Sequence, residues 1–259
     1  MNIFQKIMTP ADGSVWITGA SAGIGRAVAL EMAKRGWQVF VTARRAEPLE
    51  ALAAEHPNIT PVPGDVTKLD DMVAAVTRIT QDGPLALSIF NAGIYKPMRA
   101  QTFSAADARQ TFDVNLTGVA NGLEPVLQHM IARQHGHIAL VASVAGYRGL
   151  PNAVAYSPTK AGLIAMAEAL AMDLVDLGVR ISVINPGFVE TDATSVNEFD
   201  MPMLLQPDDA ARRIVAGLAK TGFEIRFPWQ FAAFLRLIGL LPNRAYIWAV
   251  RKALGWDKV

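Results

Sequence analysis

The stretch SVWITGASAGIGRA (14–27) joins an apolar run to a glycine-rich turn and then to a helical run. Gly19, Gly23 and Gly25 allow a tight turn and let backbone N–H groups approach a phosphate, to which the helix N-terminus adds a partial positive charge. A glycine pattern alone is a weak signal. Here it follows a predicted strand and opens a predicted helix, which is the context that the chemistry requires. We therefore predict nucleotide binding at this turn.

The rest of the chain repeats this alternation of strands and helices. Its apolar runs are mostly continuous, which is typical of strands buried on both faces of a parallel sheet. The predicted strands are 14–18, 37–43, 59–62, 85–90, 137–143, 179–185 and 223–227. The predicted helices are 23–35, 46–55, 68–81, 104–133, 153–177 and 208–220. The pattern predicts an α/β fold: a Rossmann-type, doubly wound, mostly parallel sheet with helices on both faces.

Composition limits the class of protein. The 259 residues are 51% hydrophobic and 18% charged, so a sizeable core is expected and disorder is not. With a net charge of +1, nothing global indicates nucleic acid, and without cysteine a thiolate metal site is excluded. No signal peptide and no uncharged apolar run of about 18 residues is found. We expect a soluble, cytoplasmic protein.

The end of the second predicted strand carries two arginines. In many dinucleotide-binding folds an acidic residue at this position accepts hydrogen bonds from the ribose hydroxyls. Here Ala43 is followed by Arg44 and Arg45, and a guanidinium pairs well with a phosphate. The pattern favours the 2′-phosphorylated cofactor, NADP(H), over NAD(H). The alternative is that both arginines are solvated residues at a helix start.

Tyr156 and Lys160 lie four residues apart in AYSPTKAGL (155–163), so they share one face of a predicted helix. A nearby positive charge lowers the pKa of a phenol from its ordinary value near ~10, which would create an acid–base group for neutral pH. Taken alone, the pair fits a solvated Tyr and a surface Lys better. If the helix begins at Asn152, Pro158 falls in its second turn, removes one hydrogen bond and favours a slight kink.

Taken together, these motifs resemble those of the short-chain dehydrogenase/reductase family in its compact, one-domain form, from about residue 12 to about residue 227. The motifs are TGASAGIG (18–25), GDVT (64–67), NAG (91–93), DVNLTG (113–118), VASVAG (141–146), YSPTK (156–160) and NPGFVET (185–191). The resemblance implies a catalytic set of Asn115, Ser143, Tyr156 and Lys160. It implies cofactor contacts from Gly19, Ser21, Gly23, Ile24, Gly25, Arg44, Arg45, Asp65, Val66, Asn91, Ala92, Gly93, Tyr156, Lys160, Pro186, Gly187, Val189 and Thr191.

The resemblance also implies a reaction, which is hydride transfer between the nicotinamide and a carbonyl or alcohol. Tyr156 is expected to supply the proton, Lys160 to lower the pKa of that phenol, Ser143 to orient the substrate oxygen, and Asn115 to anchor a water. Two alternatives stay open: dehydration or epimerisation on the same scaffold, and a catalytically silent NADPH-sensing protein that docks a partner. The complete Ser–Tyr–Lys set argues against the silent protein.

Other features have more than one interpretation. The segment 188–206 is long, polar and without a clear period, and we expect it to lie over the ligand. Met201 and Met203 could line a pocket or only pack. His135 and His137 flank a glycine before a strand and have no carboxylate beside them, so we expect no metal site.

The last part of the chain differs in composition. Residues 222–259 hold three of the five tryptophans, six Lys or Arg and two acids, and they read as two short helices separated by Pro242. We expect one domain, 1–259, with a core at 12–227 and an apolar, basic helical extension at 228–259. Phe231, Phe234, Leu235, Ile238 and Leu241 follow helical spacing. The extension could pack on the fold, contact a subunit of a homodimer or homotetramer, touch a membrane peripherally, or wall a site for a hydrophobic ketone or aldehyde.

Overall fold

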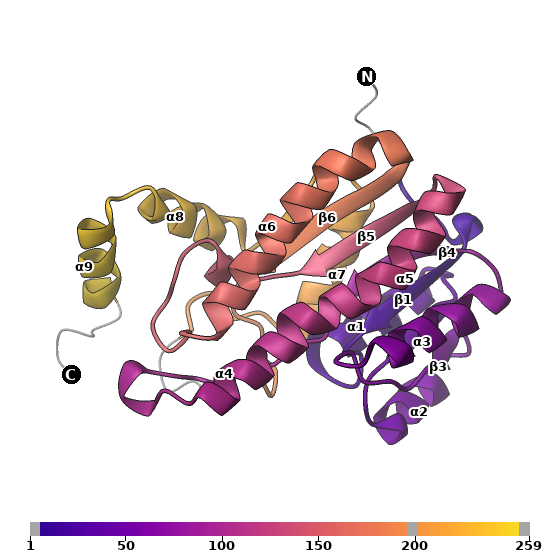
Figure 1. Cartoon of the computed structure of the whole chain (residues 1–259), viewed down its shortest axis with the longest axis horizontal. Coiled ribbons are helices and arrows are strands. Elements are labelled where there is room, and N and C mark those ends of the chain that lie inside the picture. Colours follow the sequence, from indigo (N-terminus) through magenta and orange to yellow (C-terminus); the bar gives the residue numbers. More distant parts are fainter. Residues whose placement is uncertain (1–5, 196–200, 254–259) are drawn as a thin grey trace.

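A seven-stranded parallel sheet forms the centre of the computed structural model, which describes residues 6–195 and 201–253 (Figure 1). The strands are β1 (Ser14–Thr18), β2 (Val39–Thr42), β3 (Ile59–Pro61), β4 (Leu85–Phe90), β5 (Gly136–Val141), β6 (Val179–Pro186) and β7 (Glu224–Phe227). Their order is β3-β2-β1-β4-β5-β6-β7. The strands β2 and β3 are thus added on one side of β1, and β4 to β7 on the other. The point between β1 and β4 where this order reverses is where open α/β sheets bind ligands. The predicted Rossmann-type sheet is confirmed, and so are its seven strands.

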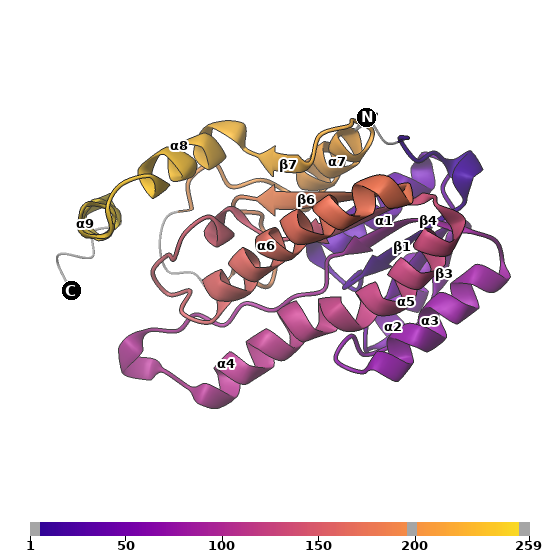
Figure 2. The ribbon, with the colours of Figure 1, turned by 45° about the horizontal axis from the view of Figure 1, so that its top comes forward.

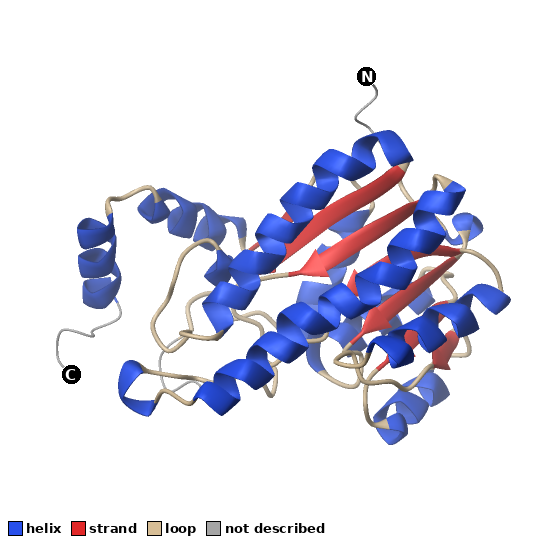
Figure 3. Cartoon of the chain, viewed as in Figure 1, coloured by secondary structure: helices blue, strands red, loops and turns tan. Residues whose placement is uncertain are grey.

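Helices cover both faces of this sheet, as Figure 3 shows with the strands enclosed between them. The helices are α1 (Gly23–Lys34), α2 (Ala46–Glu55), α3 (Leu69–Gln81), α4 (Ala105–Phe112), α5 (Gly118–Arg133), α6 (Tyr156–Leu174), α7 (Pro207–Leu218), α8 (Trp229–Gly239) and α9 (Asn243–Ala253). The core is split by the sheet: α1, α2 and α7 pack on one face, and α3, α5 and α6 on the other.

The sequence explains why these elements form. Every residue of β1, β4, β5 and β6 is buried, as expected for continuous apolar runs in a parallel sheet. In α3, Met72, Ala75, Val76 and Ile79 recur at spacings of three and four and are all buried. Fully burying a side chain such as Ile79 contributes about 1.5–3 kcal/mol, so this stripe fixes α3 on the sheet.

The helix predicted over 104–133 is interrupted. Ser104 caps α4 by accepting a hydrogen bond from the Asp107 N–H at 3.2 Å, as its position predicts. A π-helical turn, Asp113–Thr117, then separates α4 from α5. The apolar period across 104–133 continues through such a turn and therefore does not reveal it. Single π turns are frequent at functional sites, and this one contains Asn115.

The expected start of α6 was wrong, and the correction affects Pro158. The helix begins at Tyr156, not at Asn152, so Pro158 is the third residue of its first turn. The first four N–H groups of a helix have no partner within the helix. A proline in this turn therefore removes no hydrogen bond, and the expected kink has no cause.

The last two helices, α8 and α9, form the C-terminal arm (Trp229–Ala253), which extends away from the sheet in Figures 1 and 2. The two short helices predicted on either side of Pro242 are confirmed. The arm is fixed through its inner face, where Ala232 and Leu235 pack against Val144 of the loop after β5. Packing on the fold, one of the four roles considered for this segment, is therefore observed for that face.

Arg148 holds the turn between the two helices of the arm. Its guanidinium donates to the carbonyl oxygens of Gly239 at 2.6 Å and Leu241 at 2.7 Å, and also bonds the Asn243 side chain. These carbonyls lie at the C-terminal end of α8, which carries partial negative charge. The same guanidinium lies 4.1 Å from the centre of the Tyr246 ring. One side chain of the β5–α6 loop thus fastens both helices of the arm.

Candidate active site

A cavity of about 900 Å³ lies where the strands β1, β2, β4, β5 and β6 end. Eighteen of the predicted site residues line it: Gly19, Ser21, Gly23, Ile24, Arg44, Arg45, Asp65, Val66, Asn91, Ala92, Gly93, Ser143, Tyr156, Lys160, Pro186, Gly187, Val189 and Thr191. Gly25 and Asn115 stand behind the wall and do not line the cavity. Motifs far apart in the sequence meet here because parallel strands end at the same edge of the sheet.

The glycine turn between β1 and α1 is tightly packed. Gly19 has a φ of +68°, and a Cβ at this position would lie 2.6 Å from the Ala92 Cα. A Cβ on Gly25 would lie 2.3 Å from the Gly19 carbonyl oxygen, so Gly25 permits the turn without lining the cavity. Ala22, the residue before α1, provides no side-chain cap. The N–H groups that open α1 are therefore left for an anionic group, as phosphate binding requires.

The ends of β1 and β4 are tied together beside this turn. Thr18 Oγ1 accepts hydrogen bonds from the N–H groups of Asn91 at 3.1 Å and Ala92 at 3.2 Å. The Asn91 amide donates in turn to the carbonyl oxygens of Thr18 and Gly19. Because these bonds satisfy the polar groups of both strand ends, they hold the floor of the cavity rigid.

Arg44 and Asp65 lie at the end of the cavity near β2. Both also line a second cavity of about 680 Å³, which adjoins the first. Burial raises the pKa of Asp65, but hydrogen bonds from the Thr67 N–H and hydroxyl and the charge of Arg44 outweigh it, so the net pKa is lowered. The Arg44 side chain is exposed and, among the described residues, has no ion-pair partner. A guanidinium in this state is available to an anion.

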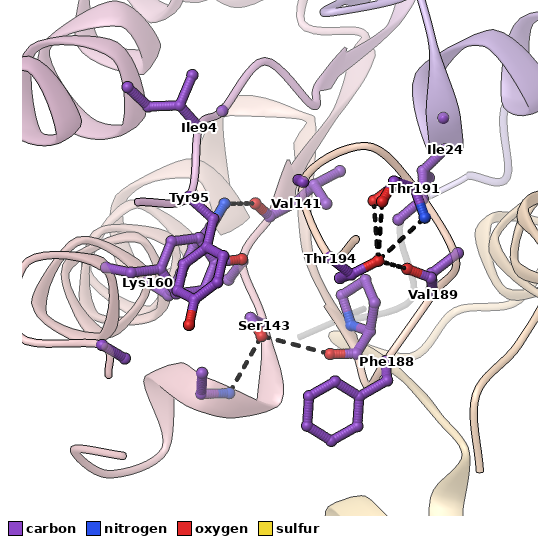
Figure 4. A pocket seen from close by; sticks show the side chains of 18 of the residues that line it. Ile24, Ile94, Tyr95, Val141, Ser143, Lys160, Phe188, Val189, Thr191 and Thr194 are labelled. Atoms are coloured by element: carbon purple, nitrogen blue, oxygen red, sulfur yellow. Dashed lines mark hydrogen bonds between the residues drawn. The ribbon is translucent and has the colours of Figure 1, made fainter. Parts of the chain in front are cut away.

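Ser143, Tyr156 and Lys160 lie together on the opposite side of the cavity. Figure 4 shows Lys160 bonded to the Val141 carbonyl, and Ser143 lies two residues after the end of β5. The Lys160 Nζ lies 5.5 Å from the centre of the Tyr156 ring and donates a hydrogen bond to the Val141 carbonyl at 2.8 Å. The Ser143 hydroxyl accepts from the Ala145 N–H at 3.1 Å and contacts the Pro186 carbonyl at 3.4 Å. The interpretation of the pair as a solvated Tyr and a surface Lys is wrong, because Lys160 is buried and Tyr156 is half-buried, and both line the cavity.

Burial controls the ionisation of this pair. It raises the pKa of Tyr156 to about 12, against the lowering effect of the hydrogen bond from Ser143 and with a further rise from Tyr95. Burial also lowers the pKa of Lys160 to about 8. We expected Lys160 to lower the pKa of the Tyr156 phenol, but without a bound cofactor the pKa of Tyr156 is raised. The desolvation of a buried phenolate outweighs a cation that is held by the Val141 carbonyl.

Asn115 braces the wall of the cavity from behind. Its carbonyl oxygen accepts from the Ile94 N–H at 2.8 Å, and its amide donates to the Ile94 carbonyl at 3.0 Å and to Thr159 Oγ1 at 3.1 Å. The π-helical turn aims this side chain at both the segment after β4 and the helix α6. Both amide protons are used in these bonds, so one lone pair of the carbonyl oxygen remains for the expected water.

The segment after β6 covers the cavity, as predicted for 188–206. Phe188, Val189, Thr191, Thr194 and Pro202 line it, and Figure 4 places the first four opposite Lys160. Thr194 Oγ1 accepts from the Thr191 N–H at 3.0 Å and donates to the Val189 carbonyl at 2.7 Å, which closes this loop on itself. Met203 is 52% exposed and does not line the cavity. The residues 196–200 lie outside the described part.

Sequence reasoning missed some residues that line the cavity. Tyr95 stacks edge-on against Tyr156, with ring centres 5.0 Å apart, and burial raises its pKa. The available signal was an aromatic two residues after the NAG motif. The arm was among the expected walls of a site, and four of its residues with helical spacing, Phe231, Phe234, Leu235 and Ile238, line the cavity, whereas Leu241 does not. Ala249, Val250 and Ala253 of α9 also line it, and small apolar residues on a terminal helix gave no signal.

His135 and His137 each contact another polar side chain of the fold. The His137 ring is buried and hydrogen-bonded to Ser182 at 2.9 Å, and burial lowers its pKa well below the ordinary value. The His135 ring lies 3.3 Å from an Asp12 carboxylate oxygen. Within residues 6–195 and 201–253, no group of three His, Cys, Asp or Glu side chains could hold a metal ion.

Comparison with known proteins identifies the family. Residues 14–201 match the model of the short chain dehydrogenase family, and the chain belongs to this family. It is an oxidoreductase of the short-chain type that acts on CH–OH and C=O groups and uses NAD(P). An uncharacterized oxidoreductase of Myxococcus xanthus is 39% identical over 241 residues, which cover 91% of this chain and 95% of that protein.

Two solved structures differ in the cofactor that they hold. A short chain dehydrogenase/reductase from Burkholderia phymatum in complex with NAD is 28% identical and has a TM-score of 0.79, covering 89% of this chain and 94% of its own. A variant of the actinorhodin polyketide ketoreductase with NADPH is 26% identical and has a TM-score of 0.76, covering 85% of this chain and 97% of its own. Because one of them holds NAD and the other NADPH, the preference of this chain has to be argued from its own residues.

Proposed function

We propose that the chain is an NADPH-dependent reductase of hydrophobic ketones or aldehydes, or a dehydrogenase of the corresponding alcohols. The observation that carries the proposal is a single cavity. Ser143, Tyr156 and Lys160 line one side of it, and the exposed cation Arg44 lies at its far end. Apolar side chains of the arm line the same cavity. The site roles assigned to these residues, and the division into a core at 12–227 and an extension at 228–259, are part of this proposal.

The residues around the cavity fit NADP(H). The uncapped N-terminus of α1 would hold the pyrophosphate, Asp65 and Val66 would contact the adenine, and Arg44 would pair with the 2′-phosphate. Pro186, Gly187, Val189 and Thr191 line the side of the cavity where the nicotinamide would lie. When bound, the nicotinamide supplies or accepts the hydride. The chain's own residues must then hold the substrate and move one proton.

Tyr156 is the proton donor in this proposal. In the direction of reduction, hydride reaches the carbonyl carbon, negative charge grows on the oxygen, and the Tyr156 hydroxyl gives that oxygen its proton. The Ser143 hydroxyl donates a hydrogen bond to the same oxygen and fixes its position. Lys160 supplies positive charge 5.5 Å from the Tyr156 ring centre, which stabilises the phenolate left behind.

The substrate class follows from the other end of the cavity. Phe188, Phe231, Leu235 and Ile238 present apolar surface beyond the catalytic residues, and Tyr95 extends that surface beside Tyr156. Apolar walls of this kind favour a carbonyl that carries a hydrophobic body, because its burial contributes about 25 cal/mol per Å². The direct test is a steady-state panel of ketones, aldehydes and alcohols of increasing chain length, with NADP(H) and NAD(H) compared. The proposal fails if none of them is turned over.

Replacing Arg44 with Ala should weaken NADPH binding selectively. The loss of a charge-assisted, bidentate phosphate contact should raise the NADPH dissociation constant by roughly ten- to a hundredfold and leave that of NADH within about twofold. Arg45→Ala is the matched control, because Arg45 lies one residue further, at the start of α2, and should matter less. Fluorescence titration gives all four constants. Equal affinities of the parent protein for NADPH and NADH would contradict the proposed preference.

The two directions of the reaction should respond differently to pH. A phenol with a pKa of about 12 keeps its proton through the neutral range, so carbonyl reduction should stay nearly constant from about pH 6 to about pH 7, below the pKa of about 8 at which Lys160 loses its charge. Alcohol oxidation requires the phenolate and should rise by up to about tenfold per pH unit over the same range. Initial rates at saturating cofactor test this. An oxidation rate that levels off near pH 7 would show that charge outweighs burial at Tyr156 in the working complex.

A further inference from the structure

The outer face of the C-terminal arm is apolar and exposed. On α8, Leu237 is 67% exposed and Leu240 is 82% exposed, and on α9 Trp248 is 62% exposed; Trp229 and Ile247 are exposed as well. The inner face is different, because Ala232, Leu235, Tyr246 and Val250 are buried. An element with one face packed on the fold and large apolar side chains gathered on the other is typical of an interaction surface.

The charge of the arm is of one sign. The arm, residues 229–253, contains four Arg or Lys and no Asp or Glu, and one of these cations, Arg236, pairs with Glu224 of β7 at 2.9 Å. On α9, Arg244 lies three and four residues before Ile247 and Trp248, so basic and apolar side chains share one exposed stripe. The Lys252 Nζ lies 5.0 Å from the centre of the Trp248 ring. Aromatic and cationic side chains on one face are the pattern of a helix that lies in a lipid–water interface.

The cavity reaches the edge of this surface. Phe234 lines the cavity and is at the same time 51% exposed, and the exposed Ala253 lines it from α9. Both helices of the arm therefore contribute a residue that faces the cavity and solvent together. A substrate that leaves the surface of the arm at Phe234 is already beside the apolar wall formed by Phe231 and Ile238.

We propose that the outer face of the C-terminal arm docks on an anionic lipid surface, and that the cavity takes its apolar carbonyl substrate from that surface through the edge at Phe234. This rests on the proposed function and deepens it by naming where the substrate resides. Arg244, Lys252 and their neighbours attract anionic headgroups, while Leu237, Leu240 and Trp248 enter the boundary of the acyl chains.

The charges favour lipid over a second copy of the chain. In a two-fold symmetric contact the arm would meet itself, and its basic residues would face basic residues with no acid of the arm to pair with them. The helices also lie on a membrane rather than cross it. Each has 11 residues and is about 16 Å long, against about 30 Å for a hydrocarbon core. No helix in the described part of the chain is long and apolar enough to span a bilayer.

Sedimentation with lipid vesicles tests the docking directly. The full chain should bind vesicles of phosphatidylcholine mixed with phosphatidylglycerol at least about tenfold more tightly than vesicles of phosphatidylcholine alone, because about 1 kcal/mol is gained per surface cation. Leu237→Ser with Leu240→Ser should lower binding to both by about tenfold or more. Arg244→Gln with Lys252→Gln should remove the preference for anionic vesicles. Met172→Ser, which removes a 72% exposed apolar side chain of α6, is the control and should change neither.

The outcomes separate docking from catalysis. The inactive Tyr156→Phe variant should bind vesicles like the parent, and the Leu237→Ser/Leu240→Ser variant should keep its NADPH affinity and its rate on a short, water-soluble carbonyl. Its rate on a long-chain aldehyde held in vesicles should fall. If the parent chain binds neither kind of vesicle, the proposed docking on lipid is wrong. It is also wrong if an oligomer dissociates when Leu237 and Leu240 are replaced, because the surface is then a subunit contact. Vesicle binding without any carbonyl turnover overturns only the proposed function.

Discussion

Tyr156→Phe should reduce carbonyl reduction by roughly a thousandfold or more while leaving NADPH binding within about twofold. The change removes only the phenolic proton, and a positioned general acid contributes about 10²–10⁴ to the rate. The ring remains, so its edge-on contact with Tyr95 and its packing under the cavity remain too. Single-turnover kinetics with preformed enzyme–NADPH complex would isolate the chemical step from cofactor binding.

The control for this variant is Tyr95→Phe. It removes a phenolic hydroxyl from a residue that lines the same cavity, with ring centres 5.0 Å apart. Tyr95→Phe should cost less than about tenfold, because the bond from its hydroxyl to the Asn152 carbonyl, at 3.5 Å, is long and weak. If Tyr156→Phe retained activity within about tenfold of the parent, another group would be the acid, and the role assigned to Tyr156 would have to be redrawn.

Lys160→Met should remove most of the activity and at the same time stabilise the fold. The buried ammonium supplies the positive charge beside Tyr156, and without it the phenolate becomes harder to form. We expect a loss of about a hundredfold or more in kcat/KM. Burial lowers the pKa of Lys160 from 10.5 to about 8, which corresponds to a cost of about 3 kcal/mol for keeping the charge buried at neutral pH. Removing the charge removes that cost.

The net gain in stability should be smaller than this cost. Methionine leaves the Val141 carbonyl without its donor, which costs about 1–3 kcal/mol, so a gain of about 0–2 kcal/mol in the free energy of unfolding is expected at pH 7. The direction in which the stability of the parent changes with pH follows from the lowered pKa of Lys160. Between pH 8 and pH 10.5 the unfolded chain holds a proton on Lys160 that the folded chain does not, so the parent gains stability as pH rises through this window.

Urea denaturation near pH 7 and near pH 10 measures both effects. The difference between Lys160→Met and the parent should shrink at the higher pH, because the parent is then relieved of its buried charge. Lys34→Met is the matched control. It lies exposed in the last turn of α1 and should change activity and stability only slightly. A Lys160→Met variant that is less stable than the parent at pH 7 would show that the hydrogen bond to Val141 outweighs the burial of charge.

The sheet could be predicted from the sequence because its strands are continuous apolar runs between glycine-rich turns. Such runs have few other uses in a chain of this composition, and their alternation with helices allows only a small set of topologies. The motifs at the strand ends followed from the same pattern. Once the strands are parallel, Gly19, Asn91, Ser143 and Pro186 have to meet at one edge.

The finer features depend on packing that sequence patterns do not carry. The π-helical turn at Asn115 keeps the apolar face of its helix in phase, so no gap in periodicity marks it. The helix α6 begins at Tyr156 and not at Asn152, because Asn152 has a φ of +59°, which an α-helix does not allow. The high pKa of Tyr156 results from burial, which is a property of the whole cavity. The segment from Phe188 to Thr194 closes over the cavity through side-chain bonds that no periodicity predicts.

The way in which Arg148 holds the arm affects which parts of such an enzyme can change during evolution. The family model ends at residue 201, so the arm lies beyond the part that defines the family. One guanidinium from the loop after Ser143 fastens that arm, through two backbone carbonyls and one side chain. Backbone carbonyls are present in any sequence, so these two bonds do not depend on the side chains of Gly239 and Leu241. Under the proposed function, substitutions of the cavity-lining side chains of the arm would change which substrates are accepted while Ser143, Tyr156 and Lys160 stay in place.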